Sequence, residues 1–287
     1  MPVELTYFQA VVLGVVEGLT EFLPISSTGH LTITEHLLGL PVDAPAVTAY
    51  TAIIQIGAIV ATFIYFARKI AHLFLAWVRG LRSAGAREHR DYRLAWAVIV
   101  GSLPVGVVGF LARDLISGPL RSLWVVAVAL VLWSAVIWWA EGRHDVLEAQ
   151  GRQRGEEGVT LRDGLVIGLV QCFSLIPGVS RSGATISAGL ALGINRVTAT
   201  ELSFFMAIPA LTAAGLFQLV EAWPDLRILG FGQMLVGIVV AFVTAYASIA
   251  WLLRFVATNS LRPFVWYRVG LGLLLAGVLA TGLMSAT

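Results

Sequence analysis

The sequence has few of the residues on which soluble or disulfide-stabilised proteins depend. Of its 287 residues only 13% are charged, and Cys172 is the single cysteine. One cysteine excludes an internal disulfide and any metal site built from several cysteines. The shortage of charge goes with 58% hydrophobic residues and a mean hydropathy of +0.85. This composition excludes an ordinary soluble domain and predicts an all-α integral membrane protein.

Six stretches are long and apolar enough to cross a bilayer as helices of about 20 residues. The predicted transmembrane helices are 47–66, 94–112, 121–140, 201–221, 232–253 and 264–284. Two further apolar stretches, 6–38 and 162–193, are each interrupted by Pro, Gly and a cluster of hydroxyls. Irregular backbone at membrane depth must be buried in protein or line a cavity. We therefore predict that each of the two stretches forms two half-helices joined as a re-entrant hairpin.

The two interrupted stretches are similar to each other. A shift of 154 residues places Glu17 on Gln171 and Ser26 on Ser180. Each half then contains one hairpin and three spans, an odd number that inserts the second half upside down. Interrupted helices at matching positions of two inverted halves indicate a site between the halves, near the middle of the membrane. The units of this predicted inverted-topology repeat are a first half at 1–140, a cytoplasmic linker at 141–161 and a second half at 162–287.

Basic residues are concentrated on one predicted side of the membrane. Fifteen of the 19 Lys and Arg residues fall on that side, which the positive-inside rule assigns to the cytoplasm. They are Arg68, Lys69, Arg79, Arg82, Arg87, Arg90, Arg93, Arg143, Arg152, Arg154, Arg162, Arg196, Arg254, Arg262 and Arg268. This orientation places both termini and the opening of the first hairpin on the outer face. The linker is predicted to be a solvated connection.

Two carboxylates lie inside the first interrupted stretch. Glu17 and Glu21 are four residues apart and therefore share one face of a helix. A charge at the centre of a bilayer costs about 2.5–3.5 kcal/mol even on the mildest scale, so that a pair needs compensation. Two neighbouring carboxylates can share a proton or hold a divalent cation. The alternative is that each one bonds a neighbouring helix and only fixes the packing.

Hydroxyls and a histidine follow at the break. Ser27 and His30 are three residues apart on one face of the second half-helix, a spacing that suits a nucleophile and its base. The alternative for His30 is a hydrogen-bonding role in packing. The neighbouring Ser26 and Thr28 are candidate substrate-binding groups, although such hydroxyls also cap helices or bond carbonyls of other helices.

The second break supplies a cation. Arg181 is flanked by Ser180 and Ser182, and Thr185 follows one turn later. The planar guanidinium suits phosphate oxygens, and the N-terminus of a half-helix offers free N–H groups to the same anion. The alternative is a structural ion pair between Arg181 and one glutamate of the first hairpin. Carboxylates for a metal, a nucleophile with a base and an arginine over an anion together indicate metal-assisted phosphoryl transfer at a membrane.

These motifs are similar to those of a known family. The patterns Glu17-x-x-x-Glu-Phe-Leu-Pro-Ile-Ser-Ser-Thr-Gly-His30 and Pro177-Gly-x-Ser-Arg-Ser-Gly-x-Thr185 resemble the undecaprenyl pyrophosphate phosphatase (bacitracin-resistance) family. The likeness covers the whole chain. It implies a bacterial inner-membrane enzyme that hydrolyses undecaprenyl diphosphate to the monophosphate and inorganic phosphate. That reaction recycles the lipid carrier for peptidoglycan synthesis and counters bacitracin.

The resemblance also implies roles for individual residues. Glu17 and Glu21 would handle a divalent cation, Mg²⁺ or Ca²⁺, and Arg181 the phosphate. Attack by Ser27 and activation of water by His30 both stay open. The expected substrate-binding residues are Ser26, Thr28, Ser180, Ser182, Thr185 and Gln55. The expected partners are the polyprenyl diphosphate lipid and the bilayer, with no nucleic acid. A homodimer stays open, as does the alternative function, a flippase or transporter of the polyprenyl phosphate.

Overall fold

The computed structural model describes residues 5–42, 44–117, 120, 122–221 and 230–285. These residues form helices and no strand, so that the predicted all-α class is confirmed. Six of the helices are long and apolar enough to cross a membrane, in agreement with the prediction. They are α3 (Pro45–Tyr65), α5 (Arg90–Leu111), α7 (Leu123–Ala149), α10 (Arg196–Glu221), α11 (Phe231–Val256) and α12 (Arg262–Ala280).

Each interrupted stretch consists of short helices on either side of a break. The first contains α1 (Tyr7–Thr20) and α2 (Ser27–Leu37). The second contains α8 (Leu161–Gln171), the 3₁₀-helix η4 (Cys172–Leu175) and α9 (Arg181–Ala191). Each break lies at the Pro, Gly and hydroxyl residues, because proline and glycine interrupt helical hydrogen bonding. This arrangement is compatible with the two predicted hairpins.

Local details recur at the predicted shift of 154 residues. Ser26 precedes α2 and Ser180 precedes α9, with φ of 78° and 77°. Among the described residues these are the two non-glycine positions with positive φ, a conformation that L-residues avoid. Each serine accepts a hydrogen bond from the backbone N–H three residues on. The entries of the hairpins match as well, since Thr6 caps α1 and Thr160 caps α8 through capping boxes. The structure is therefore compatible with the predicted repeat.

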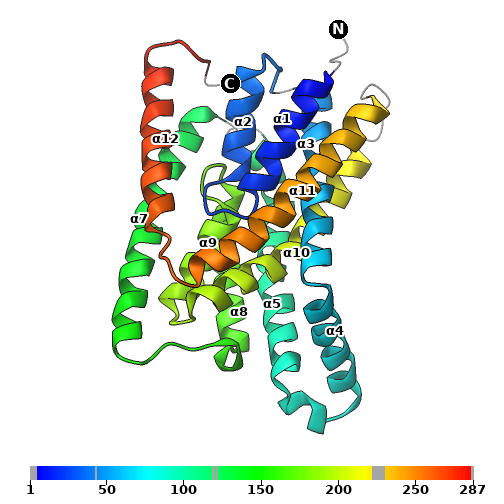
Figure 1. Ribbon diagram of the computed structural model, residues 1–287, viewed down its shortest axis with the longest axis vertical. Helices are drawn as coiled ribbons and strands as arrows, with labels where there is room; N and C mark the ends of the chain where they lie inside the picture. Colours follow the sequence, from blue (N-terminus) through cyan, green and yellow to red (C-terminus); the bar gives the residue numbers. More distant parts are fainter. Residues whose placement is uncertain (1–4, 43, 118–119, 121, 222–229, 286–287) are drawn as a thin grey trace.

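Helices from the two halves are interleaved. Helix α1 packs on α11, α8 packs on α5, and α7 packs on α12, while α9 lies in the centre of the bundle (Figure 1). Glycines allow the close crossings, because a Cβ at Gly14 would lie 2.8 Å from the carbonyl oxygen of Gly237. A Cβ at Gly168 would lie 2.1 Å from that of Gly101. Each interrupted stretch is thus packed against a long helix of the other half.

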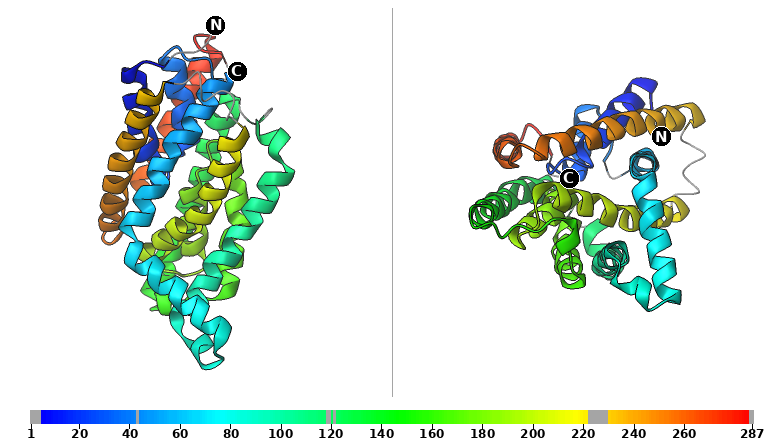
Figure 2. Two further views of the ribbon diagram at one scale, coloured as in Figure 1. Left: turned by 90° about the vertical axis from the view of Figure 1, so that its right-hand side faces the viewer. Right: turned by 60° about the horizontal axis from the view of Figure 1, so that its bottom comes forward.

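One segment between the predicted spans 47–66 and 94–112 is helical. Helix α4 (Ala67–Arg82) follows α3 and packs against α5, and α4 with the start of α5 projects from the end of the molecule opposite the start of α1 (Figure 2). Its apolar residues Ile70, Leu73 and Trp77 recur at helical spacing and join the hydrophobic core. Its basic residues hide this period in a hydropathy search for spans, which explains why the helix was missed.

The connection at 141–161 is less solvated than predicted. Helix α7 continues to Ala149, and Glu141 is buried near its end. Arg196 compensates the buried charge of Glu141, because its Nη2 lies 2.7 Å from Glu141 Oε2. Arg154 is docked in the same way, since two of its nitrogens donate to the Asp163 carboxylate at 2.8 and 2.9 Å. Paired charges therefore hold this connection against the second half.

Candidate active site

Ser27 and Glu21 form a close polar pair at the first break. Ser27 is the first residue of α2, and its Oγ donates a hydrogen bond to Glu21 Oε2 across 2.5 Å. Glu21 is the C-cap of α1 and is buried. The break brings the end of α1 beside the start of α2, so that residues six apart in sequence can meet. A carboxylate bonded to a serine hydroxyl is placed to accept its proton.

Arg181 bonds the other oxygen of the same carboxylate. It is the first residue of α9, and its Nη2 lies 3.2 Å from Glu21 Oε1. The side chains of Arg181 and Glu21 are 10% and 4% exposed, so that the pair is largely removed from solvent. The ion pair that the sequence left as an alternative is therefore formed. Within the described part of the chain Arg181 Nε has no partner, which leaves one buried donor for an anion.

Glu17 keeps an unused oxygen one turn before Glu21. The side chain is buried, and its Oε1 has no hydrogen-bond partner among the described residues. A buried acceptor without a partner costs free energy. A hard divalent cation, which binds carboxylate oxygens, would supply that partner. Glu17 therefore offers one free oxygen to a cation, whereas both oxygens of Glu21 are already bonded.

The two breaks are bonded to each other. The Gly178 N–H donates to Ser26 Oγ at 3.1 Å, and Ser182 Oγ donates to the Leu23 carbonyl at 2.9 Å. The hydroxyls of Ser180 and Ser182 lie 3.0 Å apart. Three serines predicted to bind substrate are thus buried and engaged in fixing the backbone of the breaks.

The other three predicted substrate-binding residues lie in different surroundings. Thr28 follows Ser27 on α2, and its side chain is exposed. Thr185 is buried and donates to Ser203 Oγ at 2.7 Å, and the Ser203 carbonyl in turn accepts a hydrogen bond from Arg181. Gln55 is half-buried on α3, and the described residues give it no hydrogen bond to either break.

His30 is engaged by α12 rather than by Ser27. Its Nδ1 lies 2.7 Å from the Ser26 carbonyl oxygen, and its Nε2 lies 2.7 Å from the Tyr267 hydroxyl. No hydrogen bond within the described chain joins it to Ser27, so the pairing expected from their spacing is not formed here. The reason is the break, which brings Glu21 to the serine and leaves the imidazole over the carbonyl four residues before it.

Sequence reasoning missed residues that come from distant helices. Arg268 is 0% exposed, and donates to the Pro24 and Gly178 carbonyls at 3.0 and 2.9 Å. It joins both breaks to α12, which contradicts its assignment to the basic cytoplasmic surface. The available signal was an arginine inside the apolar stretch 264–284. The missed residues of the site are Ser203, Tyr267 and Arg268.

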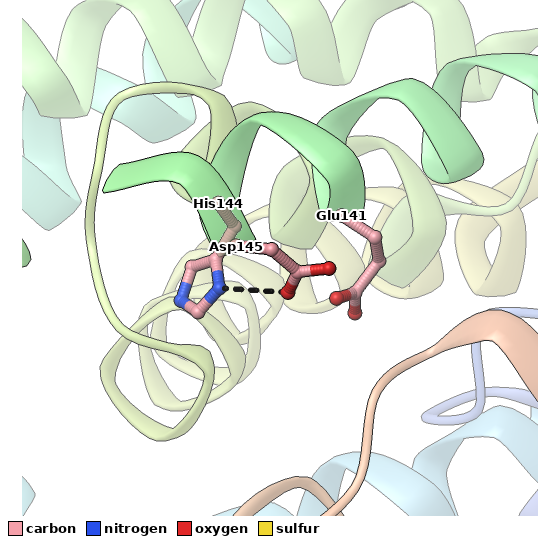
Figure 3. Close-up of side chains that lie close together, drawn as sticks. All are labelled: Glu141, His144 and Asp145. Atoms are coloured by element: carbon pink, nitrogen blue, oxygen red, sulfur yellow. Dashed lines mark ion pairs between the residues drawn. The ribbon is translucent and has the colours of Figure 1, made fainter. Parts of the chain in front are cut away.

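A second group of metal-ligand residue types lies near the end of α7. Glu141, His144 and Asp145 each place one donor atom within 4.8 Å of the others (Figure 3). By donor type the group is compatible with a divalent cation. Arg196 already bonds the carboxylates of Glu141 and Asp145, however, and Arg262 bonds Asp145 at 2.6 Å. We interpret the group as an ion-pair cluster that joins α7, α10 and α12.

Fold and site together define a multi-pass helical membrane protein whose polar cluster lies between two interrupted helical segments. The family model of the bacitracin resistance protein BacA matches residues 10–274. The chain belongs to this family. Among its relatives, undecaprenyl-diphosphatase 3 of Frankia casuarinae is 52% identical over 97% of this chain and 99% of the relative. Undecaprenyl-diphosphatase 1 of Streptomyces coelicolor is 51% identical over 96% and 97%, and undecaprenyl-diphosphatase of Cutibacterium acnes 47% over 98% and 100%.

Proposed function

We propose that this chain hydrolyses undecaprenyl diphosphate to undecaprenyl phosphate and inorganic phosphate. One observation carries the proposal: a serine hydroxyl and an arginine bond the two oxygens of one buried carboxylate. The names of the relatives support the choice of substrate. A lipid diphosphate supplies an anion for the arginine and a polyprenyl tail for the bilayer. The product returns the lipid carrier to peptidoglycan synthesis, and removal of the diphosphate counters bacitracin.

The contacts support a serine-based phosphoryl transfer. Ser27 Oγ attacks the terminal phosphorus, and its proton passes along the 2.5 Å hydrogen bond to Glu21. The bond from that phosphorus to the bridging oxygen breaks, and undecaprenyl phosphate leaves. Water then cleaves the phosphoserine, which releases inorganic phosphate and restores the hydroxyl. Arg181 neutralises charge on the transferred group, as does the N-terminal end of α2.

A divalent cation, Mg²⁺ or Ca²⁺, would bind the unpartnered Glu17 oxygen, with the nearby Glu21 carboxylate adding negative charge. When bound it would supply neutralisation of the diphosphate charge. Chelation of divalent cations should abolish phosphate release, and added Mg²⁺ should restore it. Glu17→Gln should raise the Mg²⁺ concentration needed for half-maximal activity. Activity that survives exhaustive chelation in the wild type would contradict this part of the proposal.

The same proposal includes a bacterial inner-membrane location, with an inverted repeat and both termini on the outer face. The start of α1 and the end of α12 lie at one end of the molecule, and the basic α4 lies at the other (Figure 1). Single cysteines in a Cys172→Ala background test the orientation in intact cells. An impermeant maleimide should label Thr281→Cys and spare Ser83→Cys, and the reverse labelling would refute the orientation.

Phosphate release from undecaprenyl diphosphate by the purified full-length protein in detergent tests the activity. Ser27→Ala, Glu21→Gln and Arg181→Gln should each lower release at least a hundredfold, as expected for groups acting on the transition state (about 10²–10⁴-fold). Ser83→Ala and Arg82→Gln change exposed side chains at the end of α4 and directly after it, and serve as matched controls. A flippase without hydrolytic activity would release no phosphate even as the wild type, which would overturn the proposal.

An acid quench during turnover separates the two modes of attack. Serine attack predicts phosphate on the peptide that contains Ser27, and none after Ser27→Ala. Direct attack by water predicts an unmodified peptide at every time point. The second result would retain the phosphatase and remove the nucleophilic role of Ser27.

A further inference from the structure

Tyr267 of α12 contacts the imidazole of His30 on α2. Its hydroxyl oxygen lies 2.7 Å from Nε2, and the planes of the two rings differ by 10° with centroids 5.6 Å apart. A hydrogen bond between nearly parallel ring planes restricts both the position and the rotation of the imidazole. The contact spans 237 residues of sequence, from the first interrupted segment to the last helix.

The hydrogen bonds assign the protons of His30. A carbonyl oxygen only accepts, so Nδ1, 2.7 Å from the Ser26 carbonyl, must carry the hydrogen. In the neutral ring Nε2 is then an acceptor, and the Tyr267 hydroxyl donates to it. Both ring nitrogens are therefore engaged, which leaves Glu21 as the group that receives the Ser27 proton.

The Nδ1–H bond ends on a residue with an unusual backbone. Ser26 has φ 78° and ψ 99°, a conformation that non-glycine residues adopt at a cost in free energy. Its carbonyl accepts hydrogen bonds from His30 Nδ1 at 2.7 Å and from the His30 backbone N–H at 3.2 Å. Ser27 follows directly, so the direction of its Oγ depends on how this peptide unit is held.

We propose that Tyr267 is a positioning residue: by holding His30 against the Ser26 carbonyl it keeps the Ser27 hydroxyl directed at Glu21. The expected effect of Tyr267 on catalysis rests on the phosphatase function proposed above. The contact geometry on which it depends can be tested independently of activity. Tyr267 acts through His30, so removing either residue should disturb the orientation of the Ser27 hydroxyl in the same way.

A double-mutant cycle measures this dependence. Tyr267→Phe keeps the ring and deletes the hydroxyl, and should lower kcat about tenfold with KM within about twofold, because an interaction that orients the attack acts on kcat. In a His30→Gln background the same change should cost less than about twofold, since the two residues act as one unit. Tyr246→Phe is the matched control, at 41% exposure against 48% for Tyr267. Additive losses in the cycle would overturn the proposal.

Imidazole ¹⁵N spectra test the contact without substrate. The chain has five histidines, and His30→Gln identifies the signals of His30. The wild type should show hydrogen on Nδ1 and an Nε2 shifted by hydrogen bonding. Tyr267→Phe should move the Nε2 signal alone, and Tyr246→Phe should move neither. An Nε2–H tautomer, or spectra unchanged by Tyr267→Phe, would overturn the proposal. A wild type that releases no phosphate would refute the phosphatase instead, and the spectra would still decide the role of Tyr267.

Discussion

Ser26 combines an unfavourable backbone conformation with a hydroxyl that serves two N–H groups, and two substitutions separate these effects. Its Oγ accepts from Gly29 N at 3.4 Å, which caps α2, and from Gly178 N at 3.1 Å, which ties the two breaks together. Alanine removes the hydroxyl and keeps the strain of positive φ. Glycine removes both the hydroxyl and the strain.

The magnitudes follow from these contacts. Loss of a serine N-cap costs about 1 kcal/mol, and a buried N–H left without a partner costs about 1–3 kcal/mol. Ser26→Ala should therefore lower the free energy of unfolding by about 2–4 kcal/mol. Glycine recovers about 1–3 kcal/mol of backbone strain and loses about 0.4–1 kcal/mol through the freedom of the unfolded chain. Ser26→Gly should thus be more stable than Ser26→Ala by about 1 kcal/mol.

Thermal unfolding of the purified chain in detergent measures the order of stability. One kcal/mol corresponds to about 2–4 °C in Tm for a chain of similar size. We expect Ser26→Ala to unfold about 4–16 °C below the wild type and Ser26→Gly about 2–4 °C above Ser26→Ala. Ser83→Ala, on an exposed side chain, should unfold with the wild type. A glycine variant that is no more stable than the alanine variant would refute the assignment of strain to this residue.

Three further perturbations test other contacts. Arg268→Gln should lower both Tm and phosphate release, because the Pro24 and Gly178 carbonyls lose their shared donor. Gly168→Ala should lower Tm by several degrees, since its Cβ would lie 2.1 Å from backbone; Gly106→Ala, with open space, should not. Burial acts to raise the pKa of Asp163, but hydrogen bonds from Arg154 and Thr160 outweigh it and hold that pKa below its ordinary value. The stability from this pair is present above the ordinary aspartate value of about 3.9 and is lost as pH falls through the lower folded pKa. The wild type should therefore exceed Asp163→Asn in Tm at pH 7, and the difference should shrink in acid below about pH 4.

The sequence predicted the six long helices because hydropathy reports them directly. It also located the two interruptions, since Pro24 and Pro177 stand inside otherwise apolar stretches. Helix α4 was not predicted, because its charged residues lower its mean hydropathy, although its apolar residues recur at helical spacing. Sequence spacing reports periodicity within a helix, and it therefore works best where a helix is uninterrupted.

The sequence indicated which residues belong to the site better than it indicated which of them contact one another. Glu21, Ser27 and Arg181 stood out as polar residues at membrane depth, and the structure brings them together. Helical spacing paired Ser27 with His30, but the break between α1 and α2 brings Glu21 to the Ser27 hydroxyl instead. Tyr267 lies 237 residues from His30, a contact that only the packing of α12 reveals.

The exchange of packing partners between the halves has a consequence for biosynthesis. Glu21 and Arg181 are 160 residues apart. At about 5–20 residues per second of synthesis, Glu21 exists for roughly 8–30 s before Arg181, its ion-pair partner, is synthesised. During that interval α1 also lacks α11, the helix on which it later packs. The nascent first half therefore carries the Glu21 carboxylate without its arginine, and the packing of α1 is completed only after translation of the second half.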